Sequence, residues 1–355
     1  MSSIWIVVAA ILGFLVVFQI AKASEYVAIL HGEDKARKES NRINGFMLLI
    51  FLVAGLFGVW YCNHTLKDKI LGEPASKQGE HVDTMIYITL AVTFVVFVLT
   101  QVALFWFSFK YQEKEGQKAY YFPHNNRLEL IWTVIPAIVL TVLVGFGLYY
   151  WYEITGEAPK DAQIVEVTGK QFGWEFRYPG ADGVLGKKYY RAIDPGKNNP
   201  LGQLWEDPAN RDDIYASQEM HAVVGRPVKL IIYSKDVIHD VGLAHFRLKM
   251  DAVPGQPTTM WFTPKFTTRE MKQKNGDDFE YEISCDQICG RGHFSMRGTI
   301  LVETQAEYNV WLKKQKPQYV AVMEGEQGTP ATAPADSTKN GPTAMNANAA
   351  AATAK

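Results

Sequence analysis

The chain has 355 residues, with 36 basic and 37 acidic side chains and a formal net charge of −1. This balance argues against a nucleic-acid-binding protein, which normally carries a basic excess. Hydrophobic residues make up 48% and charged residues 21%, which excludes a chain that is disordered throughout, and three cysteines are too few for a disulfide scaffold.

Uncharged apolar runs dominate the first 152 residues. A helix needs about 20 apolar residues to cross a bilayer. The last two runs exceed this length, whereas the first two are close to its lower limit, where a short buried helix of a soluble protein is the alternative. We therefore predict four transmembrane helices, over the runs Ile4–Ala21, Phe46–Cys62, Met85–Phe109 and Leu130–Tyr152.

The first run has a second interpretation as a signal peptide, because Ala21-Lys22-Ala23 resembles a cleavage site. No Lys or Arg precedes the run, although a signal peptide begins with positive charge, so we favour a retained span. Lys and Arg are most frequent in residues 22–45 and 110–128. The positive-inside rule places these segments in the cytoplasm and the C-terminal part outside.

From about residue 160 the pattern changes to short runs of β-branched and aromatic residues separated by turn signals, which predicts a β-sandwich or barrel. Residues 180–220 are expected to be a polar insertion, and Tyr308–Lys314 a closing helix. The Ala-, Thr- and Pro-rich end is predicted to be a disordered tail. The predicted strands are Ile164–Val167, Trp174–Tyr178, Val228–Tyr233, Thr258–Thr263, Phe279–Ile283 and Gly298–Val302.

A loop near the C-terminus carries a set of soft metal ligands. Cys285, Cys289, His293 and Met296 recur at offsets 0, 4, 8 and 11. Thiolates, imidazole and thioether favour copper, and a thioether is a weak axial ligand in copper electron-transfer sites but a poor ligand for zinc. The alternatives are a disulfide, a structural zinc site and a mononuclear copper site, although one copper leaves the second cysteine without a role. His239, which follows a predicted strand, is the best candidate for a second imidazole.

These residues resemble subunit II of haem–copper cytochrome c oxidase over about residues 80–315. The loop is similar to that family's binuclear copper A motif, and His239 is followed by a run similar to the family's, ending in Asp251-Ala252 and Pro254-Gly255. In the membrane part, Asn126–Pro136 resembles the family's entry into the second helix of its hairpin. The resemblance implies a membrane anchor followed by an all-β, cupredoxin-like Greek-key barrel.

The resemblance also implies a ligand set and a function. Two copper ions would be bridged by the two thiolates, and the centre would accept electrons from a cytochrome c or a c-type cytochrome domain and pass them to haem in subunit I, where oxygen is reduced to water with proton translocation. Subunits I and III are the implied partners, with no nucleic acid. The implied ligands are His239, Cys285, the backbone carbonyl of Gln287, Cys289, His293 and Met296.

Outside the copper ligands, the resemblance suggests further roles. Glu129 would lie at the mouth of a proton pathway, although a charged residue at a membrane edge is often only an interfacial anchor. Phe172 stands where the family has the tryptophan that receives electrons, and Trp174 is either part of the same entry surface or a core residue. Lys249 and Asp251 are candidates for supporting the ligands from outside.

Charge near the loop leads to two further expectations. Gln287 replaces the family's usual glutamate, so magnesium is less well supported here. An acidic group could steer a basic donor, or could simply be a solvated face; it comprises Asp236, Asp240, Asp277, Asp278, Glu280 and Asp286.

Two spans are extra relative to the family's usual single hairpin, and we expect them to dock further subunits, such as another respiratory complex. The predicted division is an extra hairpin in residues 1–75, the family's hairpin in 76–155, the copper domain in 156–320 and a tail in 321–355.

The location would be a bacterial inner membrane, with the copper domain on the periplasmic side. A membrane-tethered copper carrier is the main alternative function, and a quinol oxidase subunit would lack the copper ligands.

Overall fold

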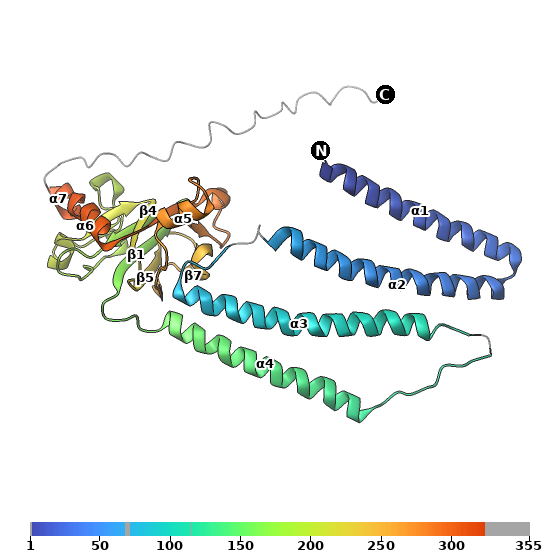
Figure 1. Ribbon diagram of the computed structural model, residues 1–355. Coiled ribbons are helices and arrows are strands. Elements are labelled where there is room, and N and C mark those ends of the chain that lie inside the picture. Colours follow the sequence, from blue (N-terminus) through green and yellow to red (C-terminus); the bar gives the residue numbers. More distant parts are fainter. Residues whose placement is uncertain (1, 68–71, 115, 324–355) are drawn as a thin grey trace, which may run out of the picture. The chain divides into compact units, whose positions relative to one another are not determined.

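The computed structural model describes residues 2–67, 72–114 and 116–323 (Figure 1). Within these residues the chain forms two compact units. Unit 1 spans Met1–Gly72 and His81–Tyr149, and unit 2 spans Glu73–Glu80 and Tyr150–Lys355. The predicted tail lies outside the described residues from 324 onward.

Long helices make up unit 1. The helices α2, α3 and α4 are long and apolar enough to cross a membrane, which confirms three of the predicted spans. The first predicted span is also helical, and within the residues that the structure describes its apolar stretch is Ala10–Ala23. Gly32, with φ of 101°, separates α1 from α2 in a conformation that favours glycine. The bounds are α1 Ser2–His31, α2 Glu33–Leu66, α3 Lys77–Lys110 and α4 Asn126–Thr155, the last of which extends into unit 2.

Two five-stranded sheets form the centre of unit 2 in the described part of the chain. The first has the strand order β3-β2-β1-β5-β8, and the second has the order β4-β10-β9-β6-β7. The pairs β1–β5 and β4–β10 are parallel, and the other neighbours are antiparallel. The strands are β1 Gln163–Lys170, β2 Gly173–Tyr178, β3 Ile214–Ser217, β4 Glu219–Val223, β5 Val228–Ser234, β6 His239–Leu243, β7 Leu248–Ala252, β8 Thr258–Phe262, β9 Tyr281–Cys285 and β10 Arg297–Glu303.

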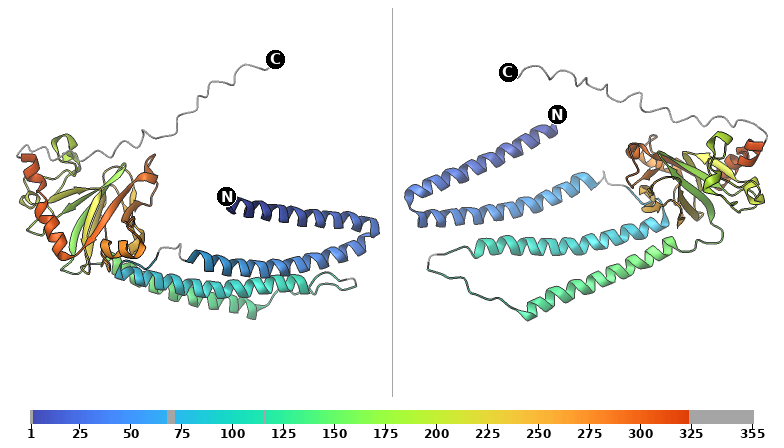
Figure 2. Two further views of the ribbon diagram at one scale, coloured as in Figure 1. Left: turned by 45° about the horizontal axis from the view of Figure 1, so that its top comes forward. Right: turned by 180° about the vertical axis from the view of Figure 1, so that it is seen from behind.

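The core of unit 2 consists of apolar side chains from both sheets, including the fully buried Trp174, Phe176 and Phe246. Three helices accompany the sheets: α5 Thr268–Asn275, α6 Gln305–Lys314 and α7 Gln318–Met323. The strands and the helices α6 and α7 can be followed in both views of Figure 2. The prediction of helical spans followed by an all-β domain is therefore confirmed.

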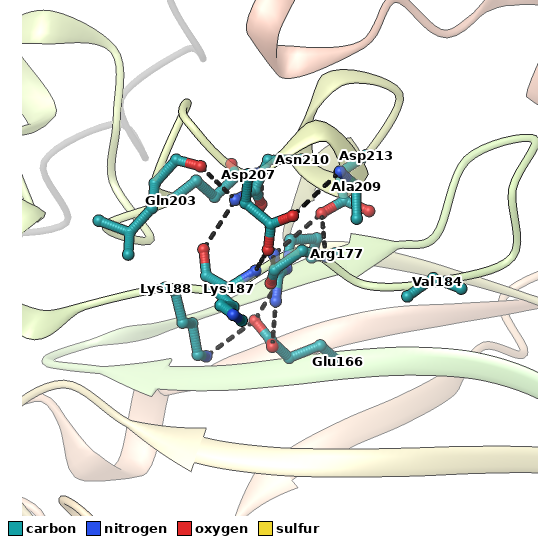
Figure 3. Close-up of polar contacts among 12 residues, drawn as sticks. Glu166, Arg177, Val184, Lys187, Lys188, Gln203, Asp207, Ala209, Asn210 and Asp213 are labelled. Carbon is teal, nitrogen blue, oxygen red and sulfur yellow. Dashed lines mark hydrogen bonds and ion pairs between the residues drawn. The ribbon is translucent and has the colours of Figure 1, made fainter.

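The polar insertion is shorter than predicted. Its last residues form β3 and β4, so that irregular structure ends near Asp213 rather than residue 220. Arg177 of β2 is buried and holds the insertion through hydrogen bonds to Gly186 O, Asn210 Oδ1 and Asp213 Oδ2, at 2.9, 3.1 and 2.9 Å (Figure 3). The guanidinium also pairs with Glu166 of β1, whose other oxygen lies 2.8 Å from Lys188 Nζ. Buried charges are stabilised by such pairing and hydrogen bonding.

Residues 73–80, which precede the body of α3, belong to unit 2. Ala75 and Ser76 are fully buried there. The Ser76 hydroxyl donates to Phe246 O at 2.7 Å, and Gln78 Oε1 accepts a hydrogen bond from Thr263 N at 2.9 Å. The domain boundary expected between residues 75 and 76 falls within this segment, all of which belongs to unit 2.

Candidate metal centre

The strands β6 and β9 bring the two halves of the candidate site together. His239 is the first residue of β6, and Cys285 is the last residue of β9. The two strands pair antiparallel, with Val241 opposite Cys285. After Cys285 the chain forms a loop and returns as β10, which pairs with β9, and Cys285 N donates to Met296 O at 3.1 Å. The loop is thus closed at its base by the sheet itself.

Five side chains and one carbonyl converge at this loop. Cys285 Sγ and Cys289 Sγ lie 3.8 Å apart. His239 Nδ1 is 3.8 Å from the first sulfur, and His293 Nδ1 is 3.7 Å from the second. Met296 Sδ is 3.7 Å from Cys289 Sγ, and the carbonyl oxygen of Gln287 is 3.1 Å from Cys285 Sγ. The structure therefore brings all six predicted ligand positions together.

Burial distinguishes this cluster from a surface group of cysteines. His239, Cys285, Cys289 and Met296 are 0%, 7%, 4% and 1% exposed. Both cysteines are free thiols. Burial, together with the neighbouring Cys285, raises the pKa of Cys289 to about 11. Metal binding needs the thiolate, so binding here would release protons and would be favoured as the pH rises.

His239 is oriented by residues outside the ligand set. Its Nε2 lies 2.7 Å from Asp236 Oδ1, which favours the proton on Nε2 and leaves the Nδ1 lone pair directed toward the sulfurs. Burial would raise the pKa of Asp236, but hydrogen bonds from Gln171 N and His239 outweigh it and hold that pKa below its usual value. The Trp174 ring packs edge-on against the imidazole at 6.1 Å between centroids.

The turn that follows β1 packs against the metal loop. Gln171 Nε2 donates to Cys289 O at 2.5 Å. The Phe172 ring lies so close to Gly292 that a Cβ there would approach it to 2.6 Å, so a side chain at this position has no room. Phe172 itself is 38% exposed, whereas Trp174 is fully buried. Of the two aromatic residues considered for electron entry, only Phe172 therefore has accessible surface beside the loop.

The predicted acidic group does not form one surface. Asp240 is 5% exposed and pairs with Asp251 across β6 and β7, and burial and Asp251 raise its pKa to about 7. Asp286 is exposed and accepts a hydrogen bond from Ser284 Oγ. Asp277, Asp278 and Glu280 lie at the other end of β9, before Tyr281. Around the loop, the most exposed large apolar side chains are Ile288 and Phe294, at 83% and 81%.

The remaining predicted residues lie away from the ligand atoms. Lys249 and Asp251 are exposed residues of β7, with Lys249 opposite Gly242 and Asp251 opposite Asp240. Glu129 is exposed in the first turn of α4, and Asn125 Oδ1 accepts a hydrogen bond from Leu128 N at that helix start. This placement leaves the proposed role of Glu129 a prediction.

Sequence reasoning missed the structural roles of Asp236 and Gln171. Asp236 could have been found from the sequence. It precedes His239 by three residues, and at this spacing a carboxylate can hydrogen-bond the imidazole across a turn. Gln171 has no such signal, since it is 118 residues from Cys289 in the sequence. Only the fold brings the two together.

The donor set fits copper better than a hard cation. Two sulfurs, two imidazole nitrogens and a thioether are soft or intermediate ligands, and no carboxylate is among them. His239 Nδ1 lies near Cys285 Sγ and His293 Nδ1 lies near Cys289 Sγ. A ring nitrogen of His239 and both sulfurs lie within 4.8 Å of one another, which is close enough to hold a metal ion.

Two family models match the chain. "Cytochrome C oxidase subunit II, transmembrane domain" matches residues 68–149, and "Cytochrome C oxidase subunit II, periplasmic domain" matches residues 163–304. Residues 1–67 lie outside both matches.

Curated relatives cover most of the chain. The alternative cytochrome c oxidase subunit 2 of Bradyrhizobium diazoefficiens is 34% identical over 244 residues, which are 68% of this chain and 83% of that protein. Cytochrome c oxidase subunit 2 of Cereibacter sphaeroides is 27% identical over 252 residues, covering 68% and 78%. Among solved structures, the periplasmic domain of subunit II of cytochrome oxidase from Bradyrhizobium japonicum is 21% identical. It covers 46% of this chain and 99% of that chain, with a TM-score of 0.32.

Proposed function

This chain belongs to the cytochrome c oxidase subunit II family, and from that premise we propose that unit 2 binds two copper ions and relays single electrons from a c-type cytochrome toward haem in subunit I. As a member of the family, the chain is a subunit of a haem–copper oxidase. Oxygen reduction and the coupled proton translocation are assigned to the complex, with the oxygen chemistry in subunit I.

The observation that carries this proposal is the convergence of both sulfurs and both Nδ1 atoms. Cys285 and Cys289 would bridge the ions as thiolates, and His239 and His293 would each bind one of them. Met296 and the Gln287 carbonyl would complete the set. When bound, the copper pair would accept and release one electron at a time.

The residues around the ligands supply rigidity. The base of the loop is held by the β9–β10 pairing and by the hydrogen bond from Cys285 N to Met296 O. Asp236 fixes the His239 ring, and Gln171 fixes the Cys289 carbonyl. Ligands that are held in this way by residues outside the set reorganise little, which favours electron transfer over metal exchange.

A membrane-tethered copper carrier fits this geometry less well. A carrier must release its metal, and release requires ligands that an acceptor can reach. Both cysteines here are more than nine-tenths buried. Slow transfer of bound copper to an external chelator is therefore expected, whereas rapid transfer would favour the carrier.

Other roles extend the proposal to the rest of the chain. Phe172 would present the aromatic contact for the electron donor, with Trp174 behind it against His239. Glu129 would take up protons at the cytoplasmic start of α4. Subunits I and III would be partners in a bacterial inner membrane, with unit 2 on the periplasmic side, and α1 and α2 would dock a further complex. Gln287 offers no carboxylate, so we assign no magnesium ion to it.

The test is metal analysis of the intact chain after copper loading, combined with electron paramagnetic resonance. Two copper ions per chain and hyperfine splitting by two equivalent nuclei are the expected result. Cys289→Ser should abolish the shared-electron spectrum, while Cys62→Ser should leave it unchanged because Cys62 lies in α2. One copper per chain, or zinc in its place, would contradict the proposal.

A further inference from the structure

A cavity of about 900 Å³ lies in unit 1 between the beginning of α2 and the end of α3. Because α2 and α3 are antiparallel, both contributions come from the same membrane side. Its basic lining residues include Arg42 from α2, Lys110 from the end of α3 and Lys114 just beyond it. Its apolar lining includes Phe46, Trp106 and Phe109. The cavity therefore combines a basic rim with an aromatic wall.

The wall is built by one ring contact between the two helices and one within α3. The Phe46 and Phe109 rings meet at 5.1 Å between centroids, and the Trp106 ring lies 6.0 Å from that of Phe109. The guanidinium of Arg42 lies 5.9 Å from the Phe46 ring centroid, which places positive charge directly beside the apolar surface. Aromatic rings next to Lys and Arg are the usual composition of a membrane–water interface.

Charge in the lining is predominantly positive. Glu113 is an acidic lining residue, but it already lies 3.6 Å from Arg37, which is outside the lining. Among the residues that the structure describes, Arg42, Lys110 and Lys114 form no ion pair with a carboxylate. An anion of another molecule would be attracted to this rim.

The position along the helices identifies the kind of anion. The apolar run of α2 begins at Phe46, and that of α3 ends at Phe109. Arg42 and Lys110 are thus at the level where lipid head groups meet the hydrocarbon, and the aromatic wall is at the level of the first acyl carbons. Basic pockets between transmembrane helices bind anionic head groups in this way.

We propose that this cavity binds an anionic phospholipid, with the phosphodiester against Arg42, Lys110 and Lys114 and the acyl chains along Phe46, Trp106 and Phe109. The site needs α2, which precedes both matched segments of the chain, together with α3, which lies within the first. The lipid would therefore join the additional helix to the oxidase hairpin. The proposal is independent of copper binding in unit 2.

The experiment uses the oxidase complex containing the full chain, stripped of lipid in a non-ionic detergent. Phosphatidylglycerol with a photoreactive acyl chain is titrated, and labelling of residues 38–46 and 106–114 is measured by peptide mass spectrometry. Phosphatidylethanolamine with the same chains, which is zwitterionic and has no net charge, serves as the comparison. We expect Arg42→Gln and Lys110→Gln to weaken phosphatidylglycerol binding by about fivefold each. Lys118→Gln with Arg127→Gln, two exposed residues outside the lining, should have no effect.

Several outcomes would overturn the proposal. Equal labelling by phosphatidylethanolamine would show that the net negative charge of the lipid is not recognised. Displacement of the lipid by millimolar inorganic phosphate would indicate a free-phosphate site instead. Protection of the cavity by a polypeptide of the complex would assign it to a protein partner. Unchanged binding by the Arg42 and Lys110 variants, with normal copper content as the folding control, would also exclude it.

Discussion

Asp236 is an exposed residue whose carboxylate sets the protonation of the buried candidate ligand His239. Its hydrogen bond to His239 Nε2 selects the tautomer in which Nδ1 is free for a metal. In Asp236→Asn the amide nitrogen can face the imidazole and favour the opposite tautomer. We expect copper affinity to fall by about tenfold to a hundredfold, measured by competition with a chelator of known affinity.

Asp277→Asn is the matched control for this change, because it removes an exposed carboxylate at the far end of β9. A similar loss of affinity in both variants would mean that overall charge, rather than the orientation of His239, is responsible. Asp236→Glu should recover part of the affinity if its carboxylate reaches Nε2.

Asp213 provides a prediction on pH because it is buried within the Arg177 cluster (Figure 3). Burial raises its pKa from 3.8 to about 6, although Arg177 acts in the opposite direction. A carboxyl group with a higher pKa in the folded state binds its proton more tightly there. Its contribution therefore favours the folded state below about pH 4 and is lost as the pH rises through about 6.

Asp213→Asn removes this titration. The free energy of unfolding of the variant minus that of the wild type should increase between pH 4 and pH 6 and then level off, measured by tryptophan fluorescence of the full chain in detergent. Asp161→Asn, an exposed residue outside the cluster, should give a difference that is nearly independent of pH. A constant difference for Asp213→Asn would show that Arg177 holds the carboxylate ionised throughout.

At the scale of elements, the sequence predicted the strands whose residues are β-branched and aromatic. All six predicted runs overlap strands of the two sheets. Four strands were not predicted. β3 and β4 fall at the end of the expected insertion. β6 contains Gly242 and two ionisable residues, and β7 has no β-branched residue. The helix α5 was also missed, although Thr267 and Glu270 form a capping box that marks its start.

Most of the candidate metal ligands could be identified from the sequence for a different reason. Cys285, Cys289, His293 and Met296 are close in sequence, so their spacing carries the information. Residues that hold the loop from outside come from the turns that follow β1 and β5, and their proximity depends on how the strands are arranged. Gly292 illustrates this, since the reason for a glycine is the ring of Phe172, which is distant in sequence.

The segment Glu73–Glu80, which includes the first residues of α3, is one whose packing against unit 2 could not be predicted from the sequence. Gln78 is 4% exposed, and its Oε1 accepts the hydrogen bond from Thr263 N just after β8. Gln78→Ala would leave this buried N–H without its partner. We expect the free energy of unfolding of unit 2 to decrease by about 1–3 kcal/mol, measured by denaturant unfolding of the full chain.

Lys77→Ala is the control, because Lys77 is exposed and its backbone hydrogen bond to Thr263 O does not depend on the side chain. We expect this variant to lower the free energy of unfolding by less than about 0.5 kcal/mol, which is the usual effect of a surface substitution. Equal destabilisation by both changes would argue that the helix start, and not the hydrogen bond to Thr263, stabilises the domain.

At the scale of the whole molecule, the candidate metal centre belongs to unit 2, whereas most of the long apolar helices belong to unit 1. Residues 73–80 are part of unit 2, whereas α1 and α2 belong to unit 1. A deletion that ends at residue 75 would remove Ala75, which is fully buried and donates its N–H to His245 O. A deletion of residues 1–66 leaves every described contact of unit 2 intact.

We therefore expect the chain without residues 1–66 to bind as much copper as the full chain and to give the same paramagnetic spectrum. What should change is the set of molecules that remain with the oxidase, because the deletion removes α2 and with it Arg42 and Phe46 of the cavity. Co-purified proteins and phosphatidylglycerol are measured by mass spectrometry after detergent extraction. An unchanged set of proteins would argue against docking of a further complex by this hairpin, and loss of copper would show that unit 2 depends on it after all.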